Sequence, residues 1–291
     1  MIEELPSLLL RGVVLGSIYA LIAMGLNIQY GVGRVFNIAH GEFLMLGAML
    51  TVSMYVGAGI DPLGSLVITG PFLFIIGFIL YRTIFTSLKN RAPSPAAFEG
   101  SSLLIAFGFI FIIQNAALLI FGGRGAKRID YLNFPIEIAG TTFRVNQVVA
   151  FAVAVVVGVV FYIFITRARL GKAIRAAAQD PATAGLMGVN INLVLAICFG
   201  LGALLAGFAG SLISTYQAVS EVMGLNYAIT AIVVMVLGGL GSIPGSFIGG
   251  IIIGIVGSIV TYYESALILP AYYALFLIIL LVKPQGLLGK K

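Results

Sequence analysis

The stretch QVVAFAVAVVVGVVFYIFITRARLGKAIR, residues 147–175, decides the fold class of this chain. Its first part, residues 147–165, carries no charged side chain and has the length, about 20 residues, that a helix needs to cross a membrane. Basic residues follow at once: Arg167, Arg169, Lys172 and Arg175. Lys and Arg at the end of a membrane segment are typical of its cytoplasmic side. The stretch therefore predicts a membrane-spanning helix that ends in the cytoplasm.

The same pattern recurs along the whole chain. Of its 291 residues, 60% are hydrophobic and 9% are charged, whereas a soluble domain carries about a quarter charged residues. Apolar runs lie at residues 8–30, 37–56, 63–86, 99–121, 147–165, 192–215, 225–240, 244–262 and 267–282. We therefore predict an all-α fold, a polytopic integral membrane helical bundle, as one domain over residues 1–291.

The basic residues also indicate the topology. They follow the third and the last run as well, at Arg82, Lys89, Arg91, Lys283, Lys290 and Lys291. Placing these groups in the cytoplasm predicts nine crossings, with the N-terminus outside and the C-terminus inside. Segment 122–146 then lies outside, as a longer loop with room for a short hairpin, although it carries four basic residues. If run 37–56 is re-entrant, the count becomes eight and the N-terminus moves inside.

Several function classes are excluded or disfavoured by composition. The net charge of +6 does not indicate a nucleic-acid partner, because the basic residues gather at the ends of the apolar runs. The single cysteine, Cys198, excludes an intramolecular disulfide and a cysteine-based metal site, and we expect it to be buried. The chain also contains no G-x-x-x-x-G-K-[ST] motif, so it carries no such phosphate-binding loop of its own.

The connector RARLGKAIRAAAQDPATAGLMGVNINL, residues 167–193, is longer than a plain loop requires. GKAIRAAAQ is rich in helix formers, and Asp180 before Pro181 is typical of a helix start. Gly188 provides a stop. We predict a helix, a sharp corner at Asp180, and a second helix of about two turns whose apolar side is Leu186 and Met187. The segment is either a solvated loop or a docking helix for a cytoplasmic protein.

The stretch RVFNIAHGEFLMLGA, residues 34–48, contains the only histidine. His40 and Glu42 would point about 200° apart on a helix, and no partner residues complete a metal site or a catalytic set. We predict that Asn37 caps a helix starting at Ile38, with His40 and Glu42 in its first two turns. The alternative, compatible with this, is that these polar residues line a pathway through the membrane.

A second break lies in GGLGSIPGSFIGG, residues 238–250. We predict that Ser242 caps a helix beginning near Ile243 or Pro244. Glycines at three-to-five-residue intervals then form a face for close helix packing: Gly245, Gly249 or Gly250, and Gly254. Alternatively, backbone amides at this break line a translocation route. The letters GLN at Gly25 and at Gly224 each precede a break, which suggests paired broken helices around a midplane pathway.

The loop STYQAVSEVMGLN, residues 214–226, faces outside in this topology. Its polar residues are Tyr216, Gln217, Glu221 and Asn226. They either help to receive a substrate or a binding protein, or belong to an ordinary solvated loop.

Three of these segments together resemble a known family, the permease subunits of bacterial ABC importers of the branched-chain amino acid type. Along the chain they are the stretch FNIAHGEFLMLGA, the connector, and VLGGLGSIPGSFIGG, residues 236–250. The three motifs stand in the order typical of that family. The residues of the connector that match are Arg169, Gly171, Ile174, Arg175, Ala176, Ala178, Asp180, Ala184 and Gly188. The resemblance extends from about Leu8 to Gly286.

The resemblance implies roles for particular residues. Within a cytoplasmic coupling segment, 167–190, residues 175–188 would form the helix that docks into an ATPase subunit. The coupling residues would be Arg175, Ala178, Asp180, Pro181, Ala184, Leu186, Met187 and Gly188. The candidate pathway residues are Asn37, His40, Glu42, Gly238, Gly239, Gly241 and Ser242.

The resemblance also implies partners and a cargo. The expected partners are two cytoplasmic ATP-binding subunits, a second permease (homologous or a second copy), an extracytoplasmic substrate-binding protein, and the lipid bilayer of the bacterial inner membrane. ATP and Mg would be bound by the partner subunits, with no cofactor on this chain, which is not an enzyme. The expected cargo is a branched-chain or other apolar amino acid. Urea, short amides or aromatic acids are alternative cargoes. The alternative function class is a secondary transporter driven by an ion gradient.

Overall fold

The predicted apolar runs all form helices. The computed structural model describes residues 4–122 and 127–289, and each run corresponds to one helix there. Eight of these helices are long and apolar enough to cross a membrane, and the ninth, α10 (Met223–Gly238), has 16 residues. Run 37–56 forms the continuous helix α2 (His40–Ala58). The short segment is therefore α10 and not the run that we considered as re-entrant, and the number of crossings stays a prediction.

The other elements connect in a simple order. They are α1 (Leu5–Gly33), α3 (Pro62–Leu80) continuing through a π-helical turn (Tyr81–Phe85) into α4 (Thr86–Arg91), α5 (Pro95–Phe121), β1 (Pro135–Ile138), β2 (Thr141–Arg144), α6 (Val145–Arg167), α7 (Arg169–Gln179), α8 (Pro181–Leu186), α9 (Ile191–Ser214), α11 (Ile243–Tyr263), a 3-10 turn (Ser265–Leu267) and α12 (Ile268–Val282). Strands β1 and β2 pair in antiparallel fashion, with Pro135 opposite Arg144. This is the short hairpin predicted for segment 122–146.

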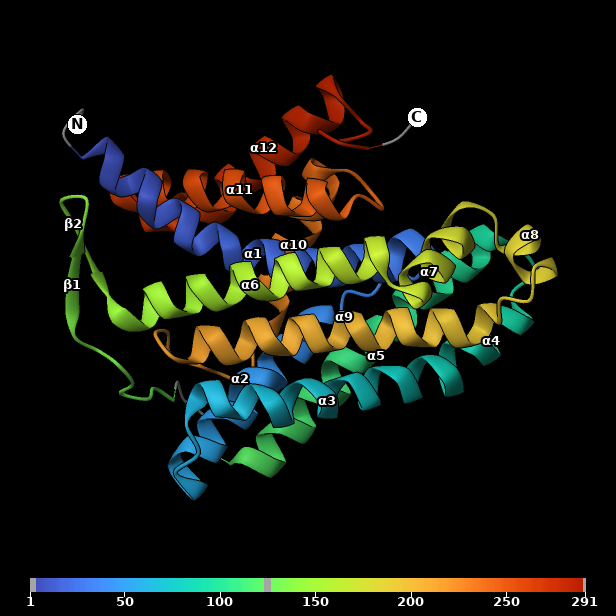
Figure 1. Ribbon diagram of the computed structural model, residues 1–291, viewed down its shortest axis with the longest axis horizontal. Coiled ribbons are helices and arrows are strands. Elements are labelled where there is room, and N and C mark those ends of the chain that lie inside the picture. Colours follow the sequence, from blue (N-terminus) through green and yellow to red (C-terminus); the bar gives the residue numbers. More distant parts are fainter. Residues whose placement is uncertain (1–3, 123–126, 290–291) are drawn as a thin grey trace.

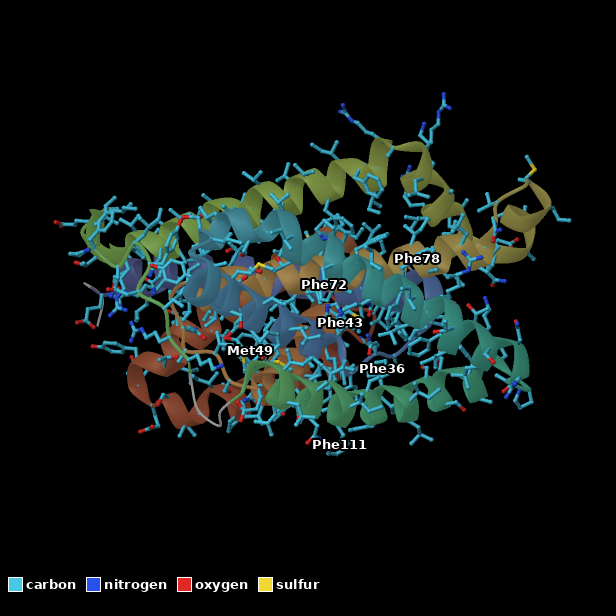
Figure 2. All side chains as sticks on the ribbon, turned by 90° about the horizontal axis from the view of Figure 1, so that it is seen from below. Phe36, Phe43, Met49, Phe72, Phe78 and Phe111 are labelled. Carbon is cyan, nitrogen blue, oxygen red and sulfur yellow. The ribbon has the colours of Figure 1, made fainter. Side chains whose placement is uncertain are left out.

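The centre of the bundle is formed by α1 and α9. Helix α1 packs against α9 and α11, and α9 also packs against α2 and α3. Apolar side chains face outward on the peripheral helices, as expected for a surface that contacts lipid rather than water. Figure 2 shows Phe43 within the bundle and Phe111 at its edge, where their side chains are 1% and 66% exposed.

The two ends of the bundle differ. The β hairpin and the start of α1 lie at one end, and α7 and α8 lie at the other (Figure 1). In the predicted topology the first end is outside and the second is cytoplasmic. The candidate sites therefore lie at three levels: the α7–α8 end, the interior, and the hairpin end.

Candidate functional site

The α7–α8 corner (residues 169–188) has the local structure that its sequence predicts. The Oδ1 atom of Asp180 accepts hydrogen bonds from the backbone N–H groups of Ala182 and Thr183, at 2.9 and 3.1 Å, and Pro181 is the first residue of α8. Gly188 follows the helix with a φ of 87°. The predicted cap, corner and stop are therefore confirmed. Hydrogen bonds from the side chain and backbone of Thr183 lower the pKa of Asp180.

Close packing fixes the corner to the end of α6. A Cβ atom on Gly171 would lie 2.4 Å from the carbonyl oxygen of Phe164 and 2.5 Å from that of Ile165, so only glycine permits this approach. Nη2 of Arg175 donates to the carbonyl oxygen of Thr166 at 3.0 Å. This bond satisfies a carbonyl group in the last turn of α6, where helical partners are missing. Arg175 therefore holds α7 against the end of α6.

The outer side of this corner is apolar and exposed. Leu186 and Met187 are 88% and 81% exposed, whereas Ala184 is buried. The five other predicted coupling residues are also exposed: Arg175, Ala178, Asp180, Pro181 and Gly188. Helix α8 projects beyond the neighbouring helices (Figure 1). The last residue of this six-residue helix and the residue that follows it thus expose two large apolar side chains, the kind of surface that a partner protein covers.

In the interior, helix α2 begins differently from the prediction. It starts at His40 and not at Ile38, its N-cap residue is Ala39, and no side chain caps it. Nδ2 of Asn37 instead donates to Oε1 of Gln29 at 3.2 Å. The predicted Asn37 cap is therefore wrong, because a polar group on α1 holds this amide.

His40 and Glu42 point to different helices, as their spacing predicts. Nε2 of His40 lies 3.0 Å from the carbonyl oxygen of Ile22 in α1, so this nitrogen carries the proton. Oε1 of Glu42 accepts from Nε2 of Gln114 in α5 at 3.0 Å. Both side chains are 0% exposed. Within the described residues, Nδ1 of His40 and Oε2 of Glu42 have no hydrogen-bond partner.

The start of α2 meets the start of α10. A Cβ atom on Gly41 would lie 1.9 Å from the carbonyl oxygen of Gly224, and a Cβ atom on Gly224 would lie 2.7 Å from the carboxyl group of Glu42. Because His40 contacts Ile22, near the middle of α1, this meeting point lies deep in the bundle. Glu42 is in the first turn of α2 and against the first turn of α10, where helix dipoles favour an anion.

The two GLN segments therefore have related positions. The glycine of the first, Gly25, lies against the ring of His40, and the glycine of the second, Gly224, lies against Glu42. The structure thus places both segments around the start of α2. This arrangement of two helices that begin inside the bundle is typical of transport pathways.

The break between α10 and α11 is held by a residue of α1. Oγ of Ser242 accepts from the backbone N–H of Gly245 at 3.1 Å, which confirms the predicted cap. Nδ2 of Asn27 donates to the carbonyl oxygen of Gly239 at 3.1 Å, and its Oδ1 accepts from the N–H of Gly241 at 2.5 Å. Gly239 and Gly241 have φ values of 107° and 80°, which favour glycine.

The C-terminal segment covers part of this break. The N–H groups of Leu287 and Leu288 donate to the carbonyl oxygens of Leu237 and Gly238, at 2.8 and 3.0 Å. The predicted close packing at these glycines is confirmed, but on two sides of α11 and not on one face. Gly245 approaches Gly238 of α10, whereas Gly250 and Gly254 approach α1, at Ala20 and at Gly12 and Gly16. The backbone groups of Gly238 and Gly239 are thus used for packing in this conformation.

Sequence reasoning missed Asn27, Gln29 and Gln114. Each is an uncharged polar residue inside an apolar run, a kind of residue that often faces the interior of a membrane bundle. That signal could have marked them as candidates, although Asn115, next to Gln114, carries the same signal and is exposed. Cys198 is buried, as expected, and in the described part of the chain no three His, Cys, Asp or Glu residues gather to hold a metal ion.

Comparison with known proteins agrees with this architecture. Residues 8–283 match the family described as "Branched-chain amino acid transport system / permease component". The chain is 32% identical to the high-affinity branched-chain amino acid transport system permease protein LivH of Salmonella typhimurium, over 96% of this chain and 94% of that protein. It is 31% identical to the corresponding permease protein BraD of Pseudomonas aeruginosa, over 97% and 95%.

A solved structure shares the fold. It is PsaBC from Streptococcus pneumoniae in complex with Fab, with a TM-score of 0.51, 15% sequence identity, and coverage of 98% of this chain and 97% of that chain. At this identity the likeness concerns the fold alone. Together with the match over residues 8–283 and the relatives above 30% identity, the conclusion is that this multi-span membrane protein belongs to the permease-component family of branched-chain amino acid transport systems.

Proposed function

We propose that this chain forms half of the translocation pathway of an ATP-driven importer in the bacterial inner membrane. Its cargo would be a branched-chain or other apolar amino acid, as the names of LivH and BraD indicate for those proteins. A second permease, homologous or identical, would complete the pathway, and an extracytoplasmic binding protein would deliver the cargo. ATP and Mg would be bound by two cytoplasmic subunits.

The observation that carries this proposal is the exposed apolar side of the α7–α8 corner. Leu186 and Met187 project from a helix whose start is capped by Asp180 and whose base is packed at Gly171. A rigid corner transmits a displacement, whereas a flexible loop absorbs it. Because α7 follows α6 and α8 leads into α9, a partner that moves this corner moves a central helix of the bundle.

The interior meeting point would then be the closed part of the pathway. Asn37, His40 and Glu42 are buried against α1, α5 and α10 in this conformation. A displacement of α10 away from α2 would uncover them, and the break at Gly238–Ser242 would be the hinge at the other end of α10. These candidate pathway residues would contact cargo only in a conformation that separates the two helices.

Coexpression with candidate ATP-binding subunits from the same genome tests the proposal. The chain is tagged and purified in detergent, and the captured ATPase is measured. We expect the native chain to capture ATPase and the double variant Leu186→Asp with Met187→Asp to lose at least about tenfold of it, since buried apolar anchors dominate such interfaces. A matched control is Ile136→Asp with Ile138→Asp, two exposed residues of the hairpin at the opposite end.

The outcomes separate clearly. Loss of ATPase in the corner variant alone supports docking at α8. Equal capture by the corner variant contradicts the assignment of this surface. If the native chain, correctly inserted, captures no ATPase, the importer proposal fails and an ion-gradient-driven transporter becomes the leading alternative.

A further inference from the structure

A cavity of about 840 Å³ opens at the hairpin end of the bundle, opposite α8. It lies between the start of α1, the hairpin, the start of α6, the end of α11 and the segment that follows α9. Neither the α7–α8 corner nor the meeting point of α2 and α10 belongs to it. The cavity therefore needs an explanation of its own.

Two arginine side chains make this cavity cationic. Arg11 of α1 and Arg144 at the end of β2 line it, and no Asp or Glu is among its lining residues. In the described part of the chain neither guanidinium forms an ion pair, and Arg11 has one long contact, 3.5 Å from Nη2 to the carbonyl oxygen of Thr142. At the rim, the carboxyl group of Glu4 lies beside Tyr262 and not between the two arginines. The two arginines thus keep free donors for an anion.

The positions of both arginines argue against a purely anchoring role. Arg11 lies within α1, a helix apolar enough to span a membrane, where a charge is costly unless it faces a water-filled cavity or a partner. Arg144 lies at the end that the topology places outside, where basic residues are less common. Its backbone is fixed because its N–H donates to Oε1 of Gln147 at 3.3 Å.

The other walls match the remainder of an amino acid. Val14, Leu15 and Phe143 provide apolar surface for an aliphatic side chain. Tyr216 and Gln217, from the loop after α9, provide oxygen atoms that can accept hydrogen bonds from an ammonium group. Oε1 of Gln217 already accepts from the Tyr227 hydroxyl at 2.6 Å, which fixes its orientation. Donors for a carboxylate, acceptors for an ammonium group and apolar walls thus surround one space.

We propose that this cavity is an outer receiving site for a zwitterionic apolar amino acid, with its carboxylate between Arg11 and Arg144. The site deepens the proposed function, on which it rests, by naming where the cargo first contacts this chain. The same arginines would also attract an acidic side chain of a docked binding protein, because the chemistry of the two carboxylates is identical. The experiment separates these sources.

Ligand binding is measured by saturation-transfer-difference NMR on the full-length chain in lipid nanodiscs. The probes are leucine, 4-methylpentanoate, which lacks the ammonium group, and 3-methylbutylamine, which lacks the carboxylate. We expect leucine and 4-methylpentanoate, which both have a carboxylate, to bind, and 3-methylbutylamine not to bind. Arg11→Gln and Arg144→Gln should each weaken leucine binding about tenfold or more, since each removes charge-assisted hydrogen bonds.

Control variants keep this test decisive. Arg128→Gln makes the same change of charge at the same end but outside the cavity lining, and it should leave leucine binding unchanged. Arg11→Lys and Arg144→Lys keep the charge and should retain most of the affinity, which distinguishes lost contacts from misfolding. Equal binding of the amine, unchanged binding in both glutamine variants, or an equal loss in Arg128→Gln would overturn the proposal.

A second measurement addresses the binding protein. Its affinity for nanodisc-embedded chain is compared between the native chain and the glutamine variants. A loss of this affinity with leucine binding intact would assign the arginines to an acidic side chain of that protein and overturn the receiving site. Neither result depends on the capture of ATPase, so failure here and failure of the importer proposal remain distinguishable.

Discussion

Replacing Gly41 with alanine would test the meeting point of α2 and α10 directly. The added Cβ atom would lie 1.9 Å from the carbonyl oxygen of Gly224, 2.7 Å from its carbonyl carbon and 2.9 Å from Cβ of Ala228. A carbon–oxygen contact normally needs about 3.3 Å, so the two helices would have to separate by about 1.4 Å. Because the atoms of Gly224 belong to the backbone, no side-chain rotation relieves the clash.

The expected cost follows from this geometry. Overpacking in a core costs about 1–3 kcal/mol, and the upper end applies where backbone meets backbone. We therefore expect Gly41→Ala to lower the free energy of unfolding by about 3 kcal/mol. Equilibrium unfolding in mixed detergent and SDS, followed by far-UV circular dichroism, measures this difference.

Gly108 provides the matched control. It lies in α5, and a Cβ atom there would meet nothing within 4 Å. Gly108→Ala should leave stability unchanged or raise it by about 0.5–1 kcal/mol, because alanine is the better helix former. If Gly41→Ala were as stable as this control, the close approach of α2 and α10 would be refuted.

Three further predictions concern hydrogen bonds. Asn27→Leu removes the Oδ1 acceptor of the Gly241 N–H and should lower the free energy of unfolding by about 2 kcal/mol, measured by the same unfolding assay. The pKa of Asp180 is lowered, so its cap stabilises α8 above the unfolded pKa of about 3.9 and loses this effect as the pH falls further. Hydrogen exchange of residues 180–188 should show this loss in the native chain and not in Asp180→Asn. Burial, with a hydrogen bond to Asp61, raises the pKa of Tyr131 to about 12. The protonated Tyr131 hydroxyl therefore contributes fully to the stability of the folded chain below about pH 10, and this contribution is lost as the pH rises towards 12. Absorbance at about 295 nm, native chain minus Tyr131→Phe, should reveal the late titration.

Local sequence predicted the two helix caps that depend on near neighbours. Asp180 and Ser242 each bond to backbone N–H groups two or three residues later, so no distant residue is needed to form them. Asn37 has the same cap chemistry, yet its amide bonds to Gln29 on another helix. A short-range pattern thus fails where a distant partner competes for the same side chain.

The amino-acid sequence by itself determined the helical membrane class, the apolar segments, the α7–α8 corner and the close packing at the glycines of α11. Only the tertiary structure decided that Glu42 meets Gln114 and Gly224, that Asn27 holds the break before α11, and that Arg11 and Arg144 share a cavity. The physical reason is that membrane helices are apolar on all sides. Without a polar face, periodicity does not show which side of a helix packs inward, and contacts between distant residues depend on how the helices pack together.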